Sequence, residues 1–379
     1  MSEDIEKIFD EYTKNQWTDG LPIIPPTKER VERMLEFTDR KPDDSLGRCP
    51  PSENEVTIEA VAANAVMAGC KPEYFPVVVT EIWAMLDRPN LRGTLATTGF
   101  VWPVGIANGP IPREIGMHCG WGLFGTGPMH RANLTIGRTM TLVCQNVGKS
   151  IPGVSEKKPQ FNIGRYGICF MENEADSPWE PLHVEKGYDI NDSTVTVYDE
   201  MDLRRGYPGY RRTPPSKAIG PLFDDSLLRR VEMFAEGHQR NILTLESSFY
   251  IITPATARIW SDRGLSKADV KRFWYEHART NIQTWFAGQS ERQQEIGVGH
   301  GLAKAPLWMR DKQGRVIAGS VSIFESPESI HIVVAGPNEE GREVWVMSLH
   351  HEDHPVITKP ITLANGTPAK SVYDFKKNK

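Results

Sequence analysis

The sequence predicts an α/β protein in which layered helices lie on at least partly parallel sheets, organised as two lobes. Three observations lead to this prediction. Apolar stretches typical of strands alternate with stretches of helical periodicity in both halves of the chain. The length of 379 residues suits two domains. A segment rich in Arg, Gly, Pro and Tyr, residues 203–221, separates the two halves.

The domain organisation follows from that segment. We expect an N-terminal α/β domain over residues 1–202, which carries a glycine-rich loop, and a C-terminal α/β domain over residues 222–379. Residues 203–221 would form a linker or a lid between the two domains.

In the first half, apolar residues recur at helical spacing between recognisable start and stop signals. Thr27 and Thr57 are suited to the N-cap position, and Gly69 is suited to end the helix that Thr57 begins. Helices are therefore expected after Thr27 and over residues 57–68, 72–86 and 131–147, and strands over residues 101–107 and 161–171.

The second half repeats the alternation of strands and helices. Ser266 precedes an amphipathic stretch and is suited to cap it. Helices are expected over residues 225–237, 254–262 and 266–279, and strands over residues 248–253 and 329–335.

Composition excludes several classes of protein. A net charge of −5 gives no basic surface for nucleic acid, and no run of eighteen apolar residues could span a bilayer. The acidic, polar start of the chain is unlike a signal peptide, so we expect a cytoplasmic protein. The five cysteines include no C-x-x-C pair, which argues against a zinc knuckle or a thioredoxin-type dithiol and favours free thiols.

The most informative segment is a glycine-rich loop, residues 119–130, that leads directly into the helix expected from residue 131. Glycines let the backbone approach a ligand closely, and a helix N-terminus favours an anion such as phosphate or carboxylate. Side chains in the first turn could add hydrogen-bond donors. The residues expected to bind an anionic substrate here are Gly122, Gly125, Gly127, His130, Arg131 and Asn133. A purely structural turn is the competing interpretation.

Two further positions carry candidate chemistry. Cys70 follows the Gly69 stop signal and precedes Lys71, so it is a candidate nucleophile or ligand, although a buried, inert thiol is the alternative. Glu172 and Glu174 follow an expected strand and would share one face of an extended segment. Paired carboxylates can transfer protons or bind a divalent cation, and a solvated acidic loop is the alternative.

Several motifs together resemble a known bacterial family. They are Asp19-Gly-Leu-Pro-Ile-Ile-Pro-Pro-Thr27, Asn64-Ala-Val-Met-Ala-Gly-Cys-Lys-Pro-Glu-Tyr-Phe-Pro76, Asn108-Gly-Pro110, Gly122-Leu-Phe-Gly, Arg131-Ala-Asn-Leu-Thr-Ile-Gly-Arg138, and Glu172-Asn-Glu174 with Ser177-Pro-Trp-Glu-Pro181. The chain resembles the large proteins that accompany small UGSC-motif proteins, which carry selenocysteine or cysteine. Members of this family are loosely labelled thiol–disulfide oxidoreductases.

The resemblance implies a small UGSC-type partner protein that would supply the reactive sulfur or selenium. It also places Cys70 inside a family motif and adds Asn64 and Asn108 to the expected substrate-binding residues.

From these features we expect an enzyme, or the large subunit of a two-protein enzyme, that acts on a small anionic metabolite by thiol-linked redox or elimination chemistry. Cys70, Glu172 and Glu174 are the expected catalytic residues. One alternative is a metal-dependent hydro-lyase or hydrolase with dispersed Cys, His and Glu ligands. Another is a non-catalytic binding subunit. The sequence leaves the cofactor open between a metal ion and none, and we expect a homo-oligomer.

Overall fold

The structure, a computed structural model, divides into two compact units that are described separately. Unit 1 comprises residues 1–175, 181–202 and 353–379, and unit 2 comprises residues 176–180 and 203–352. Within them the structure describes residues 5–96, 101–158, 163–200, 202–206, 247–281, 311–313, 319–322, 324–338, 344–349 and 355–376. Both units combine helices with mixed sheets, so the α/β class is confirmed.

Unit 1 contains a four-stranded sheet in the order β12–β5–β3–β4. Its central strand β3 (Trp102–Asn108) runs antiparallel to β5 (Thr194–Glu200) and parallel to β4 (Cys169–Met171). β12 (Ile357–Pro360) pairs antiparallel with the outer side of β5. Every residue of β3 is buried, as expected for an interior strand.

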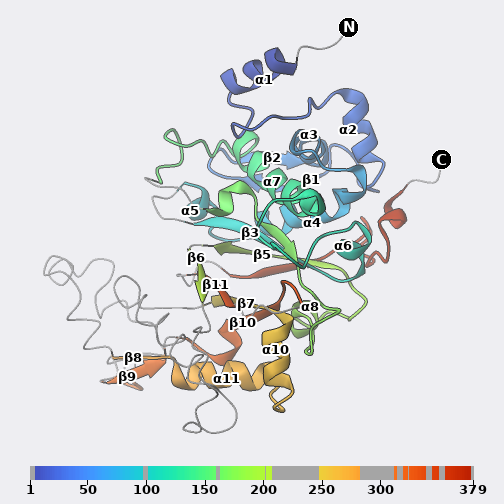
Figure 1. Ribbon diagram of the computed structural model, residues 1–379. Coiled ribbons are helices and arrows are strands. Elements are labelled where there is room, and N and C mark those ends of the chain that lie inside the picture. Colours follow the sequence, from blue (N-terminus) through green and yellow to red (C-terminus); the bar gives the residue numbers. More distant parts are fainter. Residues whose placement is uncertain are drawn as a thin grey trace, which may run out of the picture. The chain divides into compact units, whose positions relative to one another are not determined.

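Two helices of unit 1, α4 (Phe75–Leu86) and α7 (Arg131–Asn146), pack against this sheet, and α3 (Ile58–Ala68) packs on both of them (Figure 1). The hydroxyl of Thr57 accepts a hydrogen bond from the backbone N–H of Ala60 at 3.2 Å, and Gly69 ends α3 with φ +94°. The predicted start and stop of this helix are therefore confirmed. The strand predicted over residues 101–107 and the helix predicted over residues 131–147 are confirmed as β3 and α7.

Shorter elements complete unit 1. Among them α2 begins after Thr27 as predicted, although the Thr27 side chain makes no capping hydrogen bond. The remaining bounds are α1 (Ile5–Lys14), α2 (Lys28–Leu35), β1 (Ser45–Cys49), β2 (Asn54–Thr57), α5 (Leu91–Leu95), α6 (Pro110–Glu114) and α8 (Leu182–Glu185), with single 3₁₀ turns at Pro72–Tyr74, Pro128–His130, Ile163–Tyr166 and Val372–Phe375.

A contact between two glycines fixes the position of α7. A Cβ at Gly137 would lie 2.2 Å from the carbonyl oxygen of Gly167, and a Cβ at Gly167 would lie 2.3 Å from the backbone nitrogen of Arg138. Only residues without a side chain allow the helix backbone to touch the turn that leads into β4. This contact therefore sets the spacing between α7 and the sheet.

Unit 2 is built on a second mixed sheet in the order β10–β7–β11–β6. β7 and β10 are parallel, while β11 pairs antiparallel with β7. The Ser266 hydroxyl caps α11, as predicted, by accepting a hydrogen bond from the backbone N–H of Asp269 at 3.1 Å. The bounds are β6 (Asp202–Gly206), β7 (Ser247–Ile252), α10 (Pro254–Ser261), α11 (Lys267–His277), β8 (Arg279–Asn281), β9 (Ser320–Ser322), β10 (Ile330–Val334) and β11 (Val344–Leu349), with a 3₁₀ turn at Pro327–Ser329.

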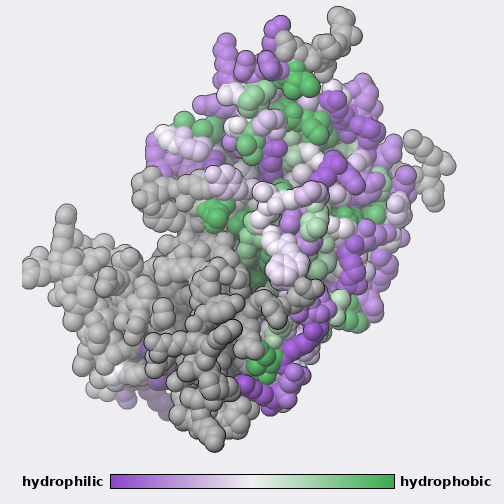
Figure 2. All heavy atoms as spheres, viewed as in Figure 1, coloured by the Kyte–Doolittle hydropathy of each residue, from purple (hydrophilic) through white to green (hydrophobic). Residues whose placement is uncertain are grey.

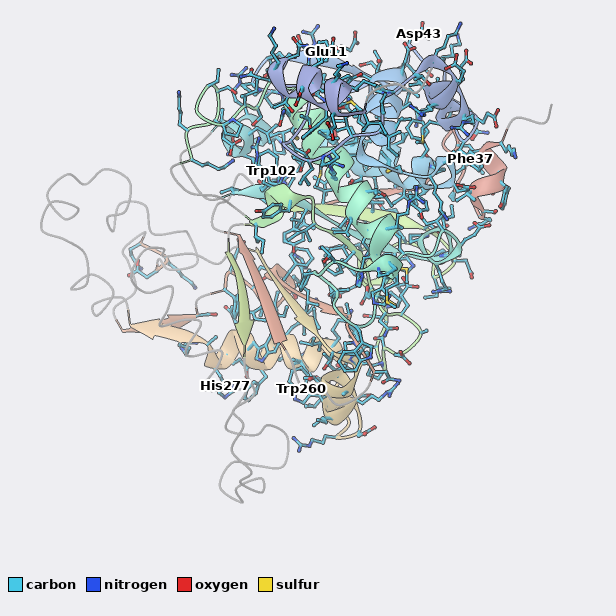
Figure 3. All side chains as sticks on the ribbon, turned by 45° about the horizontal axis from the view of Figure 1, so that its top comes forward. Glu11, Phe37, Asp43, Trp102, Trp260 and His277 are labelled. Atoms are coloured by element: carbon cyan, nitrogen blue, oxygen red, sulfur yellow. The ribbon has the colours of Figure 1, made fainter. Side chains whose placement is uncertain are left out.

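The core of unit 2 is aromatic. Trp260 of α10 stacks on Trp179 with ring centroids 6.1 Å apart and meets Trp274 of α11 edge-on at 5.9 Å. Tyr250 of β7 lies 4.4 Å from Trp274. Figure 3 shows Trp260 on α10 and His277 at the end of α11. These rings attach both helices to the sheet.

Three expectations differ from the structure. The strand predicted over residues 161–171 is wrong in extent: a 3₁₀ turn occupies Ile163–Tyr166 and only Cys169–Met171 is strand, because Gly164 and Gly167 interrupt the run. The segment 203–221 was expected to be a linker or lid, but its first residues belong to strand β6. Residues 353–379 were expected in the C-terminal domain, but they belong to unit 1, where β12 extends the sheet.

The rest of the 203–221 segment and the helix expected over residues 225–237 lie outside the described residues. The other secondary-structure predictions in the second half, including strands at 248–253 and 329–335, correspond to β7, α10, α11 and β10.

The described surface is predominantly polar. Hydrophilic side chains cover much of the face of unit 1 in Figure 2, with apolar side chains in separate small groups. Large apolar side chains are instead buried in the layer between the helices and the sheet. Among the described residues, no helix is both long enough and apolar enough to cross a membrane.

A buried ion pair joins the end of α4 to the sheet and allows a test of the fold. Asp199 of β5 pairs with Arg88, and it also accepts a hydrogen bond from the hydroxyl of Thr94 at 2.6 Å. Both charged side chains are almost completely buried.

We predict that Asp199→Asn lowers the free energy of unfolding by about 3–5 kcal/mol, because it leaves the Arg88 charge buried without a counter-charge. The matched control is Asp87→Asn, which removes a half-exposed partner of Lys359 and should cost less than about 1 kcal/mol. Urea unfolding of both variants measures the difference, and equal losses would contradict the prediction.

Candidate functional site

A cluster of polar side chains lies where β3 and β4 end. Asn108 is the last residue of β3, and Glu172 directly follows β4. Because the two strands are parallel, their carboxyl ends meet at one edge of the sheet, where α/β proteins commonly place their ligands. The Asn108 amide donates to Glu172 at 2.7 Å and to Glu174 at 3.0 Å. Three residues that we singled out in the sequence are thus in direct contact.

The carboxylate of Glu174 is held by further donors. One oxygen accepts the backbone N–H of Gly109 at 2.7 Å, and the other accepts the guanidinium of Arg113 at 2.8 Å. Glu172 is completely buried and accepts the backbone N–H of Leu182 at 2.8 Å. These hydrogen bonds fix the positions of both carboxyl groups.

His183 of α8 faces the same cluster. Its Nδ1 lies 3.7 Å from the nearer oxygen of Glu174, and the side chain is completely buried. Neither ring nitrogen has a hydrogen-bond partner among the described residues, and the same holds for the buried side-chain oxygens of Asn108 and Thr194. Asn108 and Thr194 are directly opposite each other on β3 and β5, so their side chains lie on one face of the sheet. We call Asn108, Arg113, Glu172, Glu174 and His183 the carboxylate site.

The turn after β3 requires a glycine. Gly109 has φ +93°, and a Cβ at this position would lie 2.2 Å from the carbonyl oxygen of Asp192. Gly109 therefore allows the chain to turn closely enough for its N–H to reach Glu174. It also brings α6, and with it Arg113, to the site.

Cys70 lies in a second cluster, next to the start of β4 rather than its end. Its sulfur is 3.4 Å from the hydroxyl of Thr139 on α7, and its surroundings include Glu81 and Arg131. Glu81 is the single charged residue of α4 and is completely buried. A Cβ at Gly105 of β3 would lie 2.3 Å from a Glu81 oxygen and 3.1 Å from the Cys169 sulfur, so the carboxyl and this thiol share the space beside that glycine.

Burial keeps these groups neutral. It raises the pKa of the Cys70 thiol to about 11, and it raises the pKa of Cys169, to which the Glu81 charge also contributes. Burial likewise raises the pKa of Glu81 from its ordinary value of 4.5 to about 8. At neutral pH, Cys70 is therefore a thiol and not the thiolate that a nucleophile requires.

Polar side chains in and beside the glycine-rich loop mainly bind its main chain. The His118 and His130 rings meet edge-on with centroids 4.5 Å apart, and each Nε2 contacts the carbonyl oxygen of Trp121. Asn133 is bonded to the main chain of His118 in both directions at 2.8 Å. Of its four glycines, Gly122 adopts the left-handed conformation with φ +68°, whereas Gly127 is extended. Through these contacts His130 and Asn133 stabilise the conformation of the loop.

Two expected substrate-binding residues make contacts within the helical layer. Arg131 donates to the carbonyl oxygen of Gly69 at 3.1 Å and so caps the end of α3. Asn64 is buried between α3 and α7, where it donates to Ala60 and accepts the Asn146 amide at 2.7 Å.

Sequence reasoning missed Arg113, His183 and Glu81. A signal existed for Glu81, because a lone carboxylate in the otherwise uncharged run Phe75–Leu86 marks a buried ionisable group. Arg113 and His183 had no comparable local signal, since turns bring them to Glu174 from distant parts of the chain.

In the part of the chain that the structure describes, no group of three or more Cys, His, Asp or Glu side chains is arranged to hold a metal ion. Comparison of the chain with protein-family models and with curated proteins gives no match. The chemical interpretation therefore depends on the residues themselves.

The unusual environment of Glu81 predicts a pH dependence of stability. Below about pH 4.5 the Glu81 carboxyl is protonated in both the folded and the unfolded chain. Between about pH 4.5 and 8 the unfolded chain releases a proton that the folded chain keeps, so the free energy of unfolding falls as the pH rises. Above pH 8 this contribution stays constant.

We therefore predict that the free energy of unfolding of Glu81→Gln, relative to that of the wild type, increases as the pH rises through this window. The increase should reach several kcal/mol at pH 9. Denaturant unfolding between pH 4 and 9 measures the difference, with Glu55→Gln, at an exposed position of β2, as the control. A difference that does not change with pH would contradict a neutral Glu81.

Proposed function

We propose that this chain is an enzyme, or the large subunit of a two-protein enzyme, that acts on a small carboxylate-bearing metabolite. In this proposal it removes a proton from a carbon of the metabolite during an elimination reaction. The observation that supports it best is His183. A completely buried imidazole with both nitrogens unpartnered among the described residues, 3.7 Å from a carboxylate, is suited to accept and return a proton.

The neighbouring residues have complementary roles in this proposal. Glu174, fixed by Gly109, Asn108 and Arg113, would stabilise the imidazolium that forms when His183 accepts a proton. Glu172 is a positioning residue, because it holds the Asn108 amide and the start of α8. The unpartnered oxygen of Asn108 could then accept a hydrogen bond from the substrate.

Arg113 is suited to bind the substrate anion. Its side chain is 56% exposed, and its contact with Glu174 uses one of five N–H donors. A planar guanidinium binds a carboxylate through two parallel hydrogen bonds. Because His183 is completely buried, a substrate would reach it only after a local rearrangement of the residues that cover it.

The elimination mechanism is preferred to thiol-linked redox chemistry because Cys70 and Cys169 are held as neutral thiols. A UGSC-type partner that supplies its own sulfur or selenium remains compatible with the proposal. A metal-dependent hydrolase gains no support from the described side chains.

Proton abstraction can be detected without knowing the complete reaction. The isolated chain is incubated in D₂O with a panel of small 2- and 3-substituted carboxylates, and ¹H NMR follows the loss of C–H signals. We predict exchange for at least one compound and a decrease of about 100-fold or more in His183→Gln, as expected when a general base is lost.

The matched control is His277→Gln, which changes a histidine at the exposed end of α11 in unit 2 and should leave exchange unchanged. Equal exchange in His183→Gln would remove His183 from the mechanism. No exchange by the wild-type chain with any compound would overturn an enzymatic role for the isolated chain and favour a binding subunit.

A further inference from the structure

Two buried oxygens at the carboxylate site have no hydrogen-bond partner in the part of the chain that the structure describes. They are the side-chain oxygen Oδ1 of Asn108 on β3 and the hydroxyl of Thr194 on β5. Both side chains are completely buried. A buried polar group without a partner has lost its hydrogen bonds to water and gained none in return, so such a pair indicates a place for a ligand or an ordered water.

The two side chains are neighbours across the sheet. Asn108 and Thr194 are directly opposite each other in the register of β3 and β5, and the Cβ atoms of such a pair are about 5 Å apart. The amide nitrogen of Asn108 donates to the carboxylates of Glu172 and Glu174. This fixes the orientation of the amide and leaves its oxygen as an acceptor for another group.

The hydrogen-bonding capacities of the two oxygens are complementary. Oδ1 of Asn108 can only accept, whereas the hydroxyl of Thr194 can also donate. A hydroxyl group on a ligand matches both, since it donates its own proton and accepts another. An ammonium group can only donate, so it would leave the Thr194 proton without an acceptor.

We propose that Asn108 and Thr194 bind the leaving hydroxyl group of the substrate, which is therefore a 3-hydroxycarboxylate. This inference rests on the proposed function. The carboxylate of such a compound acidifies the hydrogen on the adjacent carbon, C2, and elimination expels the hydroxyl group from C3. In the absence of substrate, an ordered water has the same hydrogen-bonding capacity and would take the place of that hydroxyl.

The reaction balances without a further reactant. Nε2 of His183 takes the proton from C2, the electron pair of that C–H bond forms the C2=C3 double bond, and the C3–O bond breaks. His183 returns the proton to the leaving hydroxide, which departs as water, so the imidazole ends neutral. The Thr194 hydroxyl donates to the oxygen that becomes negative as the C3–O bond breaks.

The groups that would bind the two ends of the substrate belong to one hydrogen-bonded unit. The hydroxyl of Ser193, which precedes Thr194, accepts the backbone N–H of Ile111 on α6 at 2.9 Å. The same helix carries Arg113, the residue suited to bind the substrate carboxylate, and Arg113 is bonded to Glu174 at 2.8 Å. The hydroxyl end and the carboxylate end of the site are thus held relative to each other.

Binding measurements test the preference for a hydroxyl group separately from catalysis. Full-length His183→Gln protein, which does not consume the ligand, is titrated calorimetrically with butyrate, pentanoate and succinate. Each is compared with its derivatives that carry a hydroxyl or an amino group on the carbon β to a carboxylate. We expect at least one hydroxyl derivative to bind about tenfold or more tightly than its parent and its amino counterpart, because these leave buried groups unpaired. Equal binding within every set, tighter binding of the amino derivatives, or no binding of any hydroxyl derivative would overturn the inference.

Substitution of Thr194 tests which residue recognises the hydroxyl group. In the same background, Thr194→Val should reduce the preference for the hydroxyl derivative over its parent by about tenfold and leave the affinity for the parent unchanged. Thr194→Ser keeps the hydroxyl and should keep the preference. The matched control is Thr196→Val, because the Thr196 hydroxyl on the same strand already bonds to that of Thr358 at 2.9 Å. A preference that survives in Thr194→Val would remove Thr194 from the site.

Turnover by the wild-type chain separates failure of this inference from failure of the proposed function. With the preferred hydroxyl derivative, ¹H NMR should show olefinic signals as water is lost. Exchange of the C2 hydrogen at equal rates in the hydroxyl derivative and its parent, without olefin, would contradict the inference and leave proton abstraction by His183 in place. A preference for the hydroxyl derivative in binding, without exchange or turnover of any compound, would contradict the proposed function and leave only recognition of a hydroxyl group.

Discussion

The contact between Gly137 and Gly167 is the constraint on which the positions of the carboxylate site and of the glycine-rich loop depend. It lets the backbone of α7 touch the turn before β4, and β4 then pairs in parallel with β3. The residues that follow these strands, Asn108 and Glu172, consequently meet at one sheet edge. The first turn of the same helix holds the main chain of His118 through Asn133. One close helix–turn contact thus aligns the carboxylate site and the glycine-rich loop on a common element.

Unit 1 buries ionisable groups in three different ways. Asp199 stays charged beside Arg88, whose opposite charge compensates for the loss of solvent. Glu172 accepts hydrogen bonds from an amide and a backbone N–H. Glu81 has no nitrogen or oxygen donor among the described residues, and burial keeps it protonated. The first two solutions supply polar partners to the buried group, and the third keeps the carboxyl neutral. His183 differs from all three, because neither of its buried ring nitrogens has a hydrogen-bond partner among the described residues.

Local patterns predicted much of the fold. Thr57 and Gly69 marked both ends of α3, and continuous apolar character identified β3, because these signals lie within the element that they define. The strand expected over residues 161–171 was too long, since two glycines with tertiary roles interrupt it. The alternation of Glu172 and Glu174 indicated a shared face, but turns formed by distant segments bring Arg113 and His183 to it. His130 was interpreted as an anion ligand because sequence does not reveal that its side chain already contacts its own loop.

The return of the chain to unit 1 has a consequence for synthesis on the ribosome. β12 covers the outer side of β5, yet more than 150 residues, which include unit 2, separate the two strands in the sequence. During translation β5 emerges long before its partner and presents an unpaired edge, which is a template for association with other nascent chains. Completion of the first sheet therefore waits for the last part of the chain, so early termination would release a protein whose N-terminal sheet is still open.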